Sequence, residues 1–329
     1  MRKLFSTLQT CTMAISLAAF AFAASAADFP TKPVTVVIGY AAGGPTDVLM
    51  RALAPRLTAE WQQQVIVDNR PGANEAIAAQ MVAKAAPDGH TLLLATEVPL
   101  TQNQHLFRTL AYNPEKDFAP VTRLLSSPLA LVVNGNVPVN TLEEFVAIAK
   151  TRGASKPLNY GSAGPGGVLH LPMAMFAKQN GLTMTHVPYK GVAPLVADLL
   201  GGQIDCAWVG VAGIAQHVRD GKLKALVVDA PTRVKSLAQV PVFSQTKVTP
   251  VQADFIFALM APAGTPADVT EKIAAAIRKS LNDPEFREKY LDPFGYVVAS
   301  STPAELAQYL AADRPRQAER IKVSGASMD

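Results

Sequence analysis

The stretch VTVVIGYAAGGPTD, which runs from Val34 to Asp47, decides the fold. Its first six residues form a nearly continuous β-branched run, which is typical of a strand buried on both faces of a sheet. A glycine-rich turn follows, and Pro45 then favours the first turn of a helix. A buried strand that leads through such a turn into a helix is the repeating unit of α/β proteins.

Short apolar runs of the same kind recur at residues 91–95, 129–133, 204–209 and 224–228. Helical patterns lie between them, and their starts carry recognisable signals. These signals are the capping box Thr141-x-x-Glu144 and the starts Thr265-Pro266 and Thr302-Pro303. Strands that alternate with helices predict an α/β fold with mainly parallel sheets.

No flexible linker occurs after residue 27, which favours two lobes that share the chain through two crossings. The extended apolar segments Val121–Leu131 and Ala253–Pro262 are the candidate crossings. We therefore expect two mainly parallel sheets flanked by helices, each in its own lobe. Lobe 1 would comprise residues 27–127 plus 253–329, and lobe 2 residues 128–252. The cleft between two such lobes is a favoured place for a ligand.

The composition excludes several classes of protein. The chain has 329 residues, of which 49% are hydrophobic and 17% charged, so it is long and apolar enough for two packed cores. A net charge of +4 without a Lys/Arg cluster argues against a nucleic-acid partner. The chain has two cysteines, and its histidines do not show the paired spacing of metal ligands, so we expect no metal site. We also expect no cofactor.

Residues 1–26 have the pattern of a secretory signal peptide. Arg2 and Lys3 precede an apolar run at residues 13–22, and Ala24-Ser25-Ala26 is a small-residue cleavage signal. The apolar run is short for a membrane span. We expect cleavage after Ala26, export to the periplasm, and a monomer that keeps a single cysteine, Cys206.

Two glycine-rich turns carry the chemistry, the first turn at Tyr40–Asp47 and the second turn at Tyr160–Gly167. Each is expected between a strand and a helix, where free amides and the helix dipole favour an anion. Either turn alone is equally well explained as a tight connection. Neither matches a nucleotide fingerprint, because Gly167 stands where a phosphate-binding loop requires lysine. Together the turns predict a site that holds one small carboxylate from both lobes.

Several motifs in order give the chain a family resemblance. They are FPTKPV at 29–34, AGGPTD at 42–47, NRPGA at 69–73, PDGHTL at 87–92, GSAG at 161–164 followed by His170-Leu171, VPYKG at 187–191, DLLGGQID at 198–205 and APAGTP at 261–266. The chain resembles the tripartite tricarboxylate transporter receptor family, also called the Bug family of periplasmic solute-binding proteins, over essentially its whole length after residue 26.

The resemblance implies a two-lobed, type II-like Venus-flytrap fold without enzymatic activity. It also implies that the first and second turns hold a small organic acid, which the protein delivers to membrane subunits of a tripartite tricarboxylate transporter. Asn74 and Glu75 depart from the family, which usually continues with glycines there, and Gly167 and Ala174 depart from a usual serine and a common acidic residue. These departures leave the ligand open among mono-, di- and tricarboxylates, acidic amino acids and aromatic acids.

The residues expected at the ligand come from both turns and from neighbouring strand ends. They are Tyr40, Ala42, Gly43, Gly44, Thr46, Asp47, Thr96, Glu97, Ser162, Ala163, Gly164, Gly166, His170 and Lys190. Asp47 is expected to cap the first helix and His170 to fix the second turn. Glu97 is interpreted either as an acceptor for a ligand amino or hydroxyl group or as an exposed loop residue, and Lys190 either as a cleft cation or as a solvated lysine.

Two other functions are weighed against transport. A ligand-sensing subunit for a signalling partner has the same sequence signature as a transport receptor. A serine hydrolase that uses Ser162 is disfavoured, because Gly161-Ser162-Ala163-Gly164 is not the G-x-S-x-G nucleophile elbow.

Overall fold

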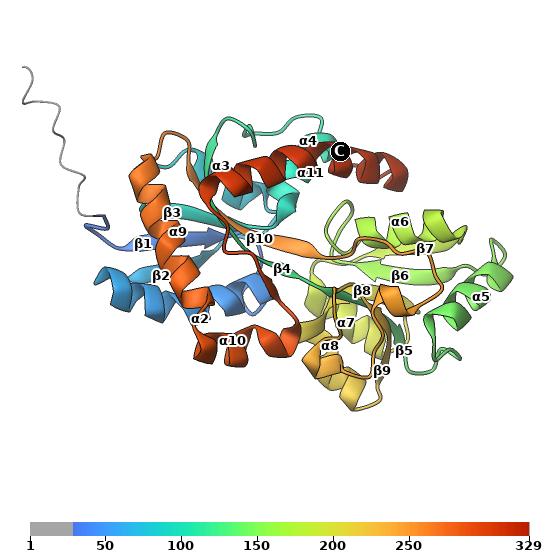
Figure 1. Cartoon of the computed structure of the whole chain (residues 1–329). Helices are drawn as coiled ribbons and strands as arrows, with labels where there is room; N and C mark the ends of the chain where they lie inside the picture. Colours follow the sequence, from blue (N-terminus) through green and yellow to red (C-terminus); the bar gives the residue numbers. More distant parts are fainter. Residues whose placement is uncertain (1–28, 329) are drawn as a thin grey trace, which may run out of the picture.

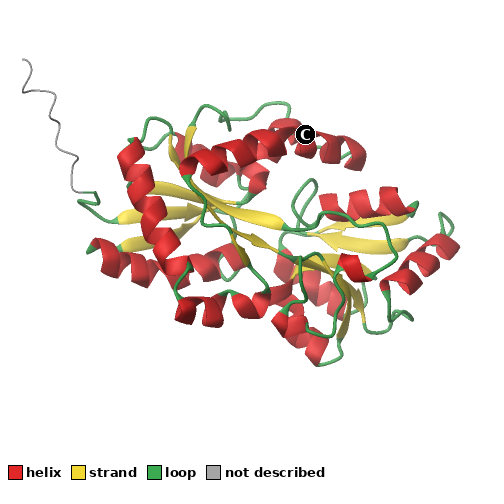
Figure 2. Ribbon diagram, viewed as in Figure 1, coloured by secondary structure: helices red, strands yellow, loops and turns green. Residues whose placement is uncertain are grey.

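A computed structural model describes residues 29–328, so the expected signal peptide lies outside the described residues. Figure 1 shows two sheets, one to the left and one to the right of the view, and Figure 2 shows helices flanking both. The first sheet has six strands in the order β11-β4-β10-β3-β1-β2, and the second has five in the order β7-β6-β8-β5-β9. This arrangement is the two-sheet α/β fold that the sequence predicts.

The strands of the first sheet are β1 (Val34–Ile38), β2 (Val65–Asn69), β3 (Thr91–Ala95), β4 (Phe118–Ser127), β10 (Phe255–Pro262) and β11 (Val297–Val298). The strands of the second sheet are β5 (Leu129–Asn134), β6 (Leu158–Ser162), β7 (Met184–Pro188), β8 (Cys206–Gly210) and β9 (Leu223–Val228).

The helices adjoining the first sheet in sequence are α2 (Pro45–Trp61), α3 (Ala76–Ala83), α4 (Asn103–Leu106), α9 (Ala267–Leu281), α10 (Pro284–Tyr290) and α11 (Pro303–Ser324). Those that adjoin the second are α5 (Leu142–Arg152), α6 (Leu171–Asn180), α7 (Val192–Leu200) and α8 (Val211–Arg219). Single-turn elements are η1 (Val98–Gln102), η2 (Lys235–Leu237), η3 (Phe243–Gln245) and η4 (Asp292–Phe294). Within residues 29–328, no helix combines the length and apolar character needed to cross a bilayer.

The direction of the strands differs in one respect from the sequence prediction. β1 runs parallel to β2 and β3, and β6 runs parallel to β7 and β8. However, β10 is antiparallel to β3 and β4, and β5 is antiparallel to β8 and β9. The sheets are therefore mixed rather than mainly parallel. The antiparallel strands carry the chain between the sheets, so the route of the chain sets their direction instead of a helical crossover.

The chain passes between the sheets twice. The first passage is at Pro128, between the end of β4 and the start of β5, inside the predicted crossing Val121–Leu131. The return passage occupies residues 229–254 and ends where β10 begins. The predicted second crossing, Ala253–Pro262, is therefore mostly a sheet strand. Every residue of β10 is buried, and it pairs on both sides, which explains its continuous apolar sequence.

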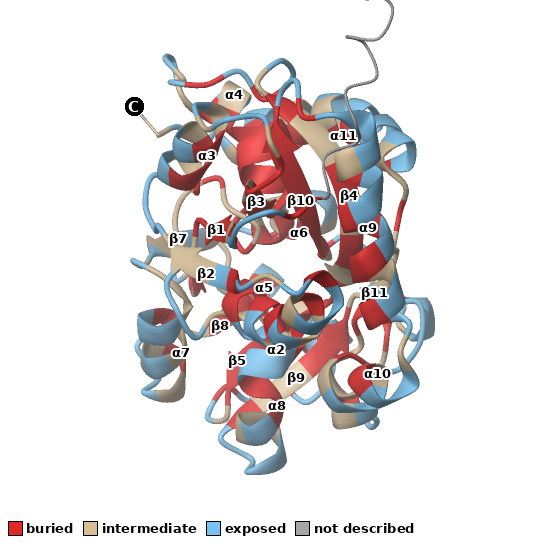
Figure 3. Ribbon diagram, turned by 90° about the vertical axis from the view of Figure 1, so that its left-hand side faces the viewer, coloured by how far each residue is buried: buried red, intermediate tan, exposed pale blue. Residues whose placement is uncertain are grey.

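Each sheet has an apolar core beneath its helices, and Figure 3 shows buried residues along the strands with exposed residues on the outer helix faces. In the second sheet, Trp208 of β8 meets Phe176 of α6 edge to face, with ring centroids 6.3 Å apart. Trp208 and the free Cys206 are both fully buried, so both serve packing. These contacts fix α6, and with it the segment that follows the second turn.

A smaller apolar contact joins the two halves of the molecule. Leu106 of α4, Leu171 of α6 and Ile321 of α11 form a buried cluster. Helix α11 packs on β4 and η1 of the first half and on α6 of the second, as Figure 1 also shows. Gly166 of the second turn lies against the Leu106 side chain, so closely that a Cβ at position 166 would overlap with it. The second turn therefore reaches the first half by close packing.

We expect Gly166→Ala to destabilise the fold more than Gly181→Ala, by about 1–3 kcal/mol. Both glycines have a left-handed φ, +69° at Gly166 and +64° at Gly181, so both substitutions add similar backbone strain. Open space surrounds Gly181, whereas Gly166 faces Leu106. Urea unfolding of each variant measures the difference. The loss caused by Gly166→Ala should be smaller in a Leu106→Ala background, where the overlapping side chain is absent. Equal losses at the two glycines would contradict the packing argument.

Candidate functional site

The first turn joins β1 to α2 and is held by Asp47. The Asp47 Oδ2 atom accepts from the Gly43 amide at 2.8 Å, and its carboxylate pairs with Arg51 at 2.9 Å. Burial opposes ionisation of Asp47, but the bonds from Arg51 and Gly43 outweigh it and keep the pKa of this carboxyl below its usual value. Gly43 has a φ of +84°, whereas Gly44 has φ −75° and ψ 168°, an extended conformation open to any residue. The expectation that Asp47 caps α2 is wrong, because the cap residue is Gly44 and, in the described part of the chain, no side chain bonds the first-turn amides. Asp47 instead braces the turn, and it occupies the Gly43 amide that sequence reasoning assigned to the ligand.

The N-terminus of α2 keeps donors that the turn itself does not use. Pro45 stands at the first helical position, and the amides of Thr46 and Asp47 have no partner inside the helix. The Thr46 side chain is 2% exposed, and its hydroxyl has no hydrogen-bond partner. A buried hydroxyl without a partner is costly in a folded protein, so it marks a place where a further group belongs. Amides, hydroxyl and helix dipole together suit an anion.

The second turn differs from the first, because its polar groups satisfy one another. The Ser162 hydroxyl donates to the Gly164 carbonyl at 2.9 Å and accepts from the Gly164 amide at 3.2 Å. The Gly166 amide donates to His170 Nδ1 at 2.9 Å. Helix α6 begins at Leu171, four residues beyond the end of the turn. The expectation of free amides at Gly164 and Gly166 is therefore wrong for this conformation.

A stack of rings supports the second turn from behind. His170 and His186 lie face to face with centroids 3.9 Å apart, and Tyr160 stacks on His186 at 5.0 Å. Burial, with a contribution from the charge of His186, lowers the pKa of His170 to about 3, so its ring is neutral and Nδ1 accepts from Gly166. The structure thus agrees with the predicted role of His170 in fixing the turn.

The geometry around Ser162 corrects the hydrolase alternative. Ser162 Oγ lies 2.7 Å from His186 Nε2, which resembles a nucleophile and its base. Ser162 is completely buried, however, and its hydroxyl is bound within the turn. Among residues 29–328, no carboxylate is hydrogen bonded to His186 to orient it as a base. The pair therefore stabilises the end of β6.

A third segment, Ala73–Glu75, lies between the two turns, and we call it the left-handed segment. Its three residues have φ values of +46°, +50° and +64°, which side chains other than glycine rarely adopt. Sequence reasoning noted Asn74 and Glu75 as departures from a family pattern and assigned them no role. The unusual backbone has no signature in the sequence, because alanine and glutamate do not favour a positive φ.

Glu75 fastens the left-handed segment to the first turn. Its side chain is 1% exposed and packs over Gly39, where a Cβ would overlap with it. One carboxylate oxygen accepts from the Thr96 amide at 3.2 Å, the other from the Thr96 hydroxyl, and the Tyr40 hydroxyl also bonds to the carboxylate. Glu75 thereby gathers the ends of β1 and β3 at one edge of the sheet.

Asn74 joins the first half to the second turn. Its Nδ2 donates to the Pro165 carbonyl at 3.0 Å. The Asn74 carbonyl in turn accepts from Asn103 Nδ2 at 2.8 Å. The left-handed segment thus contacts the second turn through Asn74 and the start of the first turn through the bond between Glu75 and Tyr40.

Glu97 and Lys190 have no hydrogen bond to either turn within residues 29–328. Glu97 is buried, and its Oε2 accepts from the Ile256 amide of β10 at 3.0 Å. The burial of Glu97 corrects its interpretation as an exposed loop residue. Lys190 is exposed beyond β7. Ala42 is also exposed, and Ala163 is partly exposed at the edge of the second turn.

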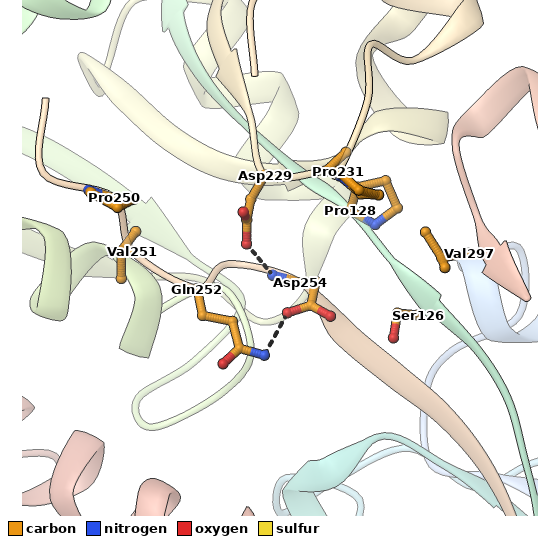
Figure 4. A pocket seen from close by; sticks show the side chains of 10 residues that line it. Ser126, Pro128, Asp229, Pro231, Pro250, Val251, Gln252, Asp254 and Val297 are labelled. Atoms are coloured by element: carbon orange, nitrogen blue, oxygen red, sulfur yellow. Dashed lines mark hydrogen bonds between the residues drawn. The ribbon is translucent and has the colours of Figure 1, made fainter. Parts of the chain in front are cut away.

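A pocket of about 370 Å³ lies beside the two passages between the sheets, and its lining includes Pro128, Asp229, Gln252 and Asp254. Figure 4 shows Asp229 bonded to the backbone at Asp254, and Gln252 bonded to the Asp254 carboxylate. None of the expected ligand residues lines this pocket. No group of three or more His, Cys, Asp or Glu side chains within residues 29–328 is arranged to hold a metal ion.

Comparisons with known proteins agree with this architecture. The profile described as the tripartite tricarboxylate transporter family receptor matches residues 49–325. The chain is 30% identical over 318 residues to Protein BugT of Bordetella pertussis, which covers 95% of this chain and 96% of that protein. It is similar to an R. palustris protein determined with adipate, at 29% identity and a TM-score of 0.84, covering 91% of this chain and 99% of that one. It is also similar to MatC from Rhodopseudomonas palustris with bound malate, at 31% identity and a TM-score of 0.79, covering 89% of this chain and 100% of that one.

Two sheets, two passages of the chain and these similarities define a solute-binding protein, a class without enzymatic activity. The chain belongs to the tripartite tricarboxylate transporter receptor family and is a periplasmic solute-binding receptor. The two-lobed fold class predicted from the sequence is confirmed.

The free energy of unfolding is expected to decrease less steeply with rising pH in Glu75→Gln than in the wild type. Burial raises the pKa of Glu75 from 4.5 to about 7, although bonds from Thr96 and Tyr40 act in the opposite direction. The folded state therefore holds a proton that the unfolded state releases. The resulting stabilisation is complete below pH 4.5 and is lost as the pH rises to about 7. Glutamine cannot titrate, so the variant should lack a loss on the order of 3 kcal/mol.

The measurement is the free energy of unfolding of both proteins across this pH range. Glu97, whose pKa burial raises to about 8, is present in both, so the difference isolates Glu75. The exposed Glu288→Gln in α10 provides the matched control. Parallel pH curves for wild type and Glu75→Gln would contradict the assignment.

Proposed function

We propose that this receptor captures a small carboxylate between its two lobes, at the N-terminus of α2, and delivers it to membrane subunits of a tripartite tricarboxylate transporter. The observation that carries the proposal is the buried Thr46 hydroxyl without a partner, beside two amides that the helix leaves free. A carboxylate oxygen seated there would satisfy all three donors. The relatives determined with adipate and with malate support a dicarboxylate as the ligand.

The proposed lobes are residues 27–127 plus 253–329 and residues 128–252, and ligand binding closes them about the two passages. The sheets support this division, because the strands within residues 129–228 pair with one another and all other strands pair in the first sheet. We further propose that the receptor is a monomer, exported with residues 1–26 as a signal peptide cut after Ala26.

A thermal-shift screen of organic acids tests the ligand class. The panel comprises monocarboxylates, malate, adipate, tricarboxylates, acidic amino acids and aromatic acids, with zinc and NAD as negative controls. A ligand that binds the folded state raises its stability as its concentration exceeds Kd, so we expect at least one dicarboxylate to raise Tm. A shift with zinc or NAD, and with no carboxylate, would overturn the proposal.

Thr46→Val then tests the site. Removing a buried hydroxyl without a partner should leave the Tm of the ligand-free protein unchanged or raise it. The affinity for the acid found in the screen should fall about ten- to a hundredfold, because one hydrogen bond to a charged group is lost. Thr270→Val is the matched control, since Thr270 is buried in the first turn of α9 and its hydroxyl donates to the Ala267 carbonyl at 2.9 Å. Thr270→Val should lose stability and keep its affinity for the acid. If Thr46→Val keeps full affinity, the ligand does not bind at Thr46.

A further inference from the structure

The left-handed segment concentrates an unusual backbone at the boundary between the two halves. Within residues 29–328, five residues other than glycine have a positive φ, and three of them are Ala73, Asn74 and Glu75. Such a conformation persists where surrounding contacts hold it, and it clusters at functional positions. The contacts that hold this segment therefore indicate what it does.

Most of these contacts belong to the first half. Glu75 is bound by Thr96 and Tyr40, the Ala76 amide donates to the Ala73 carbonyl at 3.0 Å, and the Asn74 carbonyl accepts from Asn103. The backbone of the segment is thus fixed on the first sheet. The Asn74 side chain points the other way, and its Nδ2 reaches the Pro165 carbonyl of the second turn.

Most polar groups of the second turn are bonded within the second half and do not reach the first half. Its Gly164 amide and carbonyl are both bound by Ser162, and its Gly166 amide is bound by His170. The Pro165 carbonyl is directed outward to Asn74. The neighbouring contact of Gly166 with Leu106 is apolar and has no directional requirement. The Asn74 bond therefore fixes how the two turns are aligned.

We infer that Asn74 is the positioning residue that selects the closed form of this receptor, with Glu75 as its anchor. Its amide meets Pro165 when the two halves approach, and in an open form it is solvated. The bond adds to the stability of the closed form without touching the ligand. A ligand that requires both turns then binds more tightly, because the closed population is larger. This inference rests on the proposed function, in which the two halves close to capture the carboxylate.

The experiment measures closing directly, in the full protein after removal of residues 1–26. Spin labels are placed at Met81→Cys of α3 and Gln179→Cys of α6, two exposed positions on opposite halves. The native Cys206 is buried and escapes labelling. Distance distributions are recorded by double electron–electron resonance in buffer and in concentrated sucrose, which favours compact states without acting as a ligand.

Two variants separate closing from folding. Asn74→Asp keeps the shape and replaces the donor with an oxygen that repels the Pro165 carbonyl. Asn74→Gly removes the side chain and, because glycine adopts a positive φ freely, should keep the unfolding transition. Asn282→Asp is the control, since Asn282 Nδ2 bonds the Arg278 carbonyl within one half. We expect both Asn74 variants to lose the short distance, with the closed population reduced about tenfold, and Asn282→Asp to keep it.

Wild-type distance distributions in both Asn74 variants would overturn the inference. A wild-type protein that shows no short distance, either in sucrose or with the best acid from the screen, would also overturn it. The sucrose measurement contains no carboxylate, so it reports the closed population even if no acid in the screen binds. Conversely, an acid that binds and closes the wild type and the Asn74 variants equally would leave the proposed function intact and remove Asn74 from it.

Discussion

Two carboxylates, the partly buried Asp229 and the buried Glu97, hold the backbone where the chain returns from the second sheet to the first. Asp229 Oδ2 accepts from the amides of Ala253 and Asp254, and Glu97 Oε2 accepts from the amide of Ile256. These bonds place the start of β10, which then pairs between β3 and β4. Because β3 pairs with β1, the position of β10 also sets the sheet edge at which Tyr40, Thr96 and the first turn lie.

The two turns look alike in sequence and serve different physical ends. In the first turn, Asp47 takes up one amide and leaves the start of α2 with donors that have no partner. In the second turn, Ser162 and His170 take up the amides, and the glycines allow close approach to Leu106. In the proposed function, the first turn therefore provides charge complementarity to an anion, whereas the second provides a packed surface. A site of this kind needs one half that attracts the ligand and another that encloses it.

The sequence predicts the features that depend on local chemistry. A β-branched run identifies β1 and a short apolar run identifies β3. Glycine and proline identify the turns, and Thr302 with Glu305 forms the capping box that starts α11. The direction of β10 was not predictable, because a buried apolar run has the same sequence whether its neighbours are parallel or antiparallel. Glu97 was misplaced for a related reason. Thr96 and Glu97 are adjacent after β3, and their side chains leave the backbone toward different partners, Glu75 and Ile256.

The left-handed segment shows why part of a site of this kind is hidden from sequence reasoning. Glycine at position 74 would adopt the positive φ more easily but would have no side-chain amide. Asparagine keeps the directional hydrogen bond to Pro165 at the cost of a less favourable backbone conformation. In a receptor that closes, the apparent affinity is the intrinsic affinity reduced by the fraction of molecules able to close. A residue that never meets the ligand can therefore set the affinity, while the donors proposed at α2 hold the ligand itself. Affinity and specificity are then adjustable at separate positions. A motif search directed at ligand contacts finds the positions that set specificity and misses a position such as Asn74.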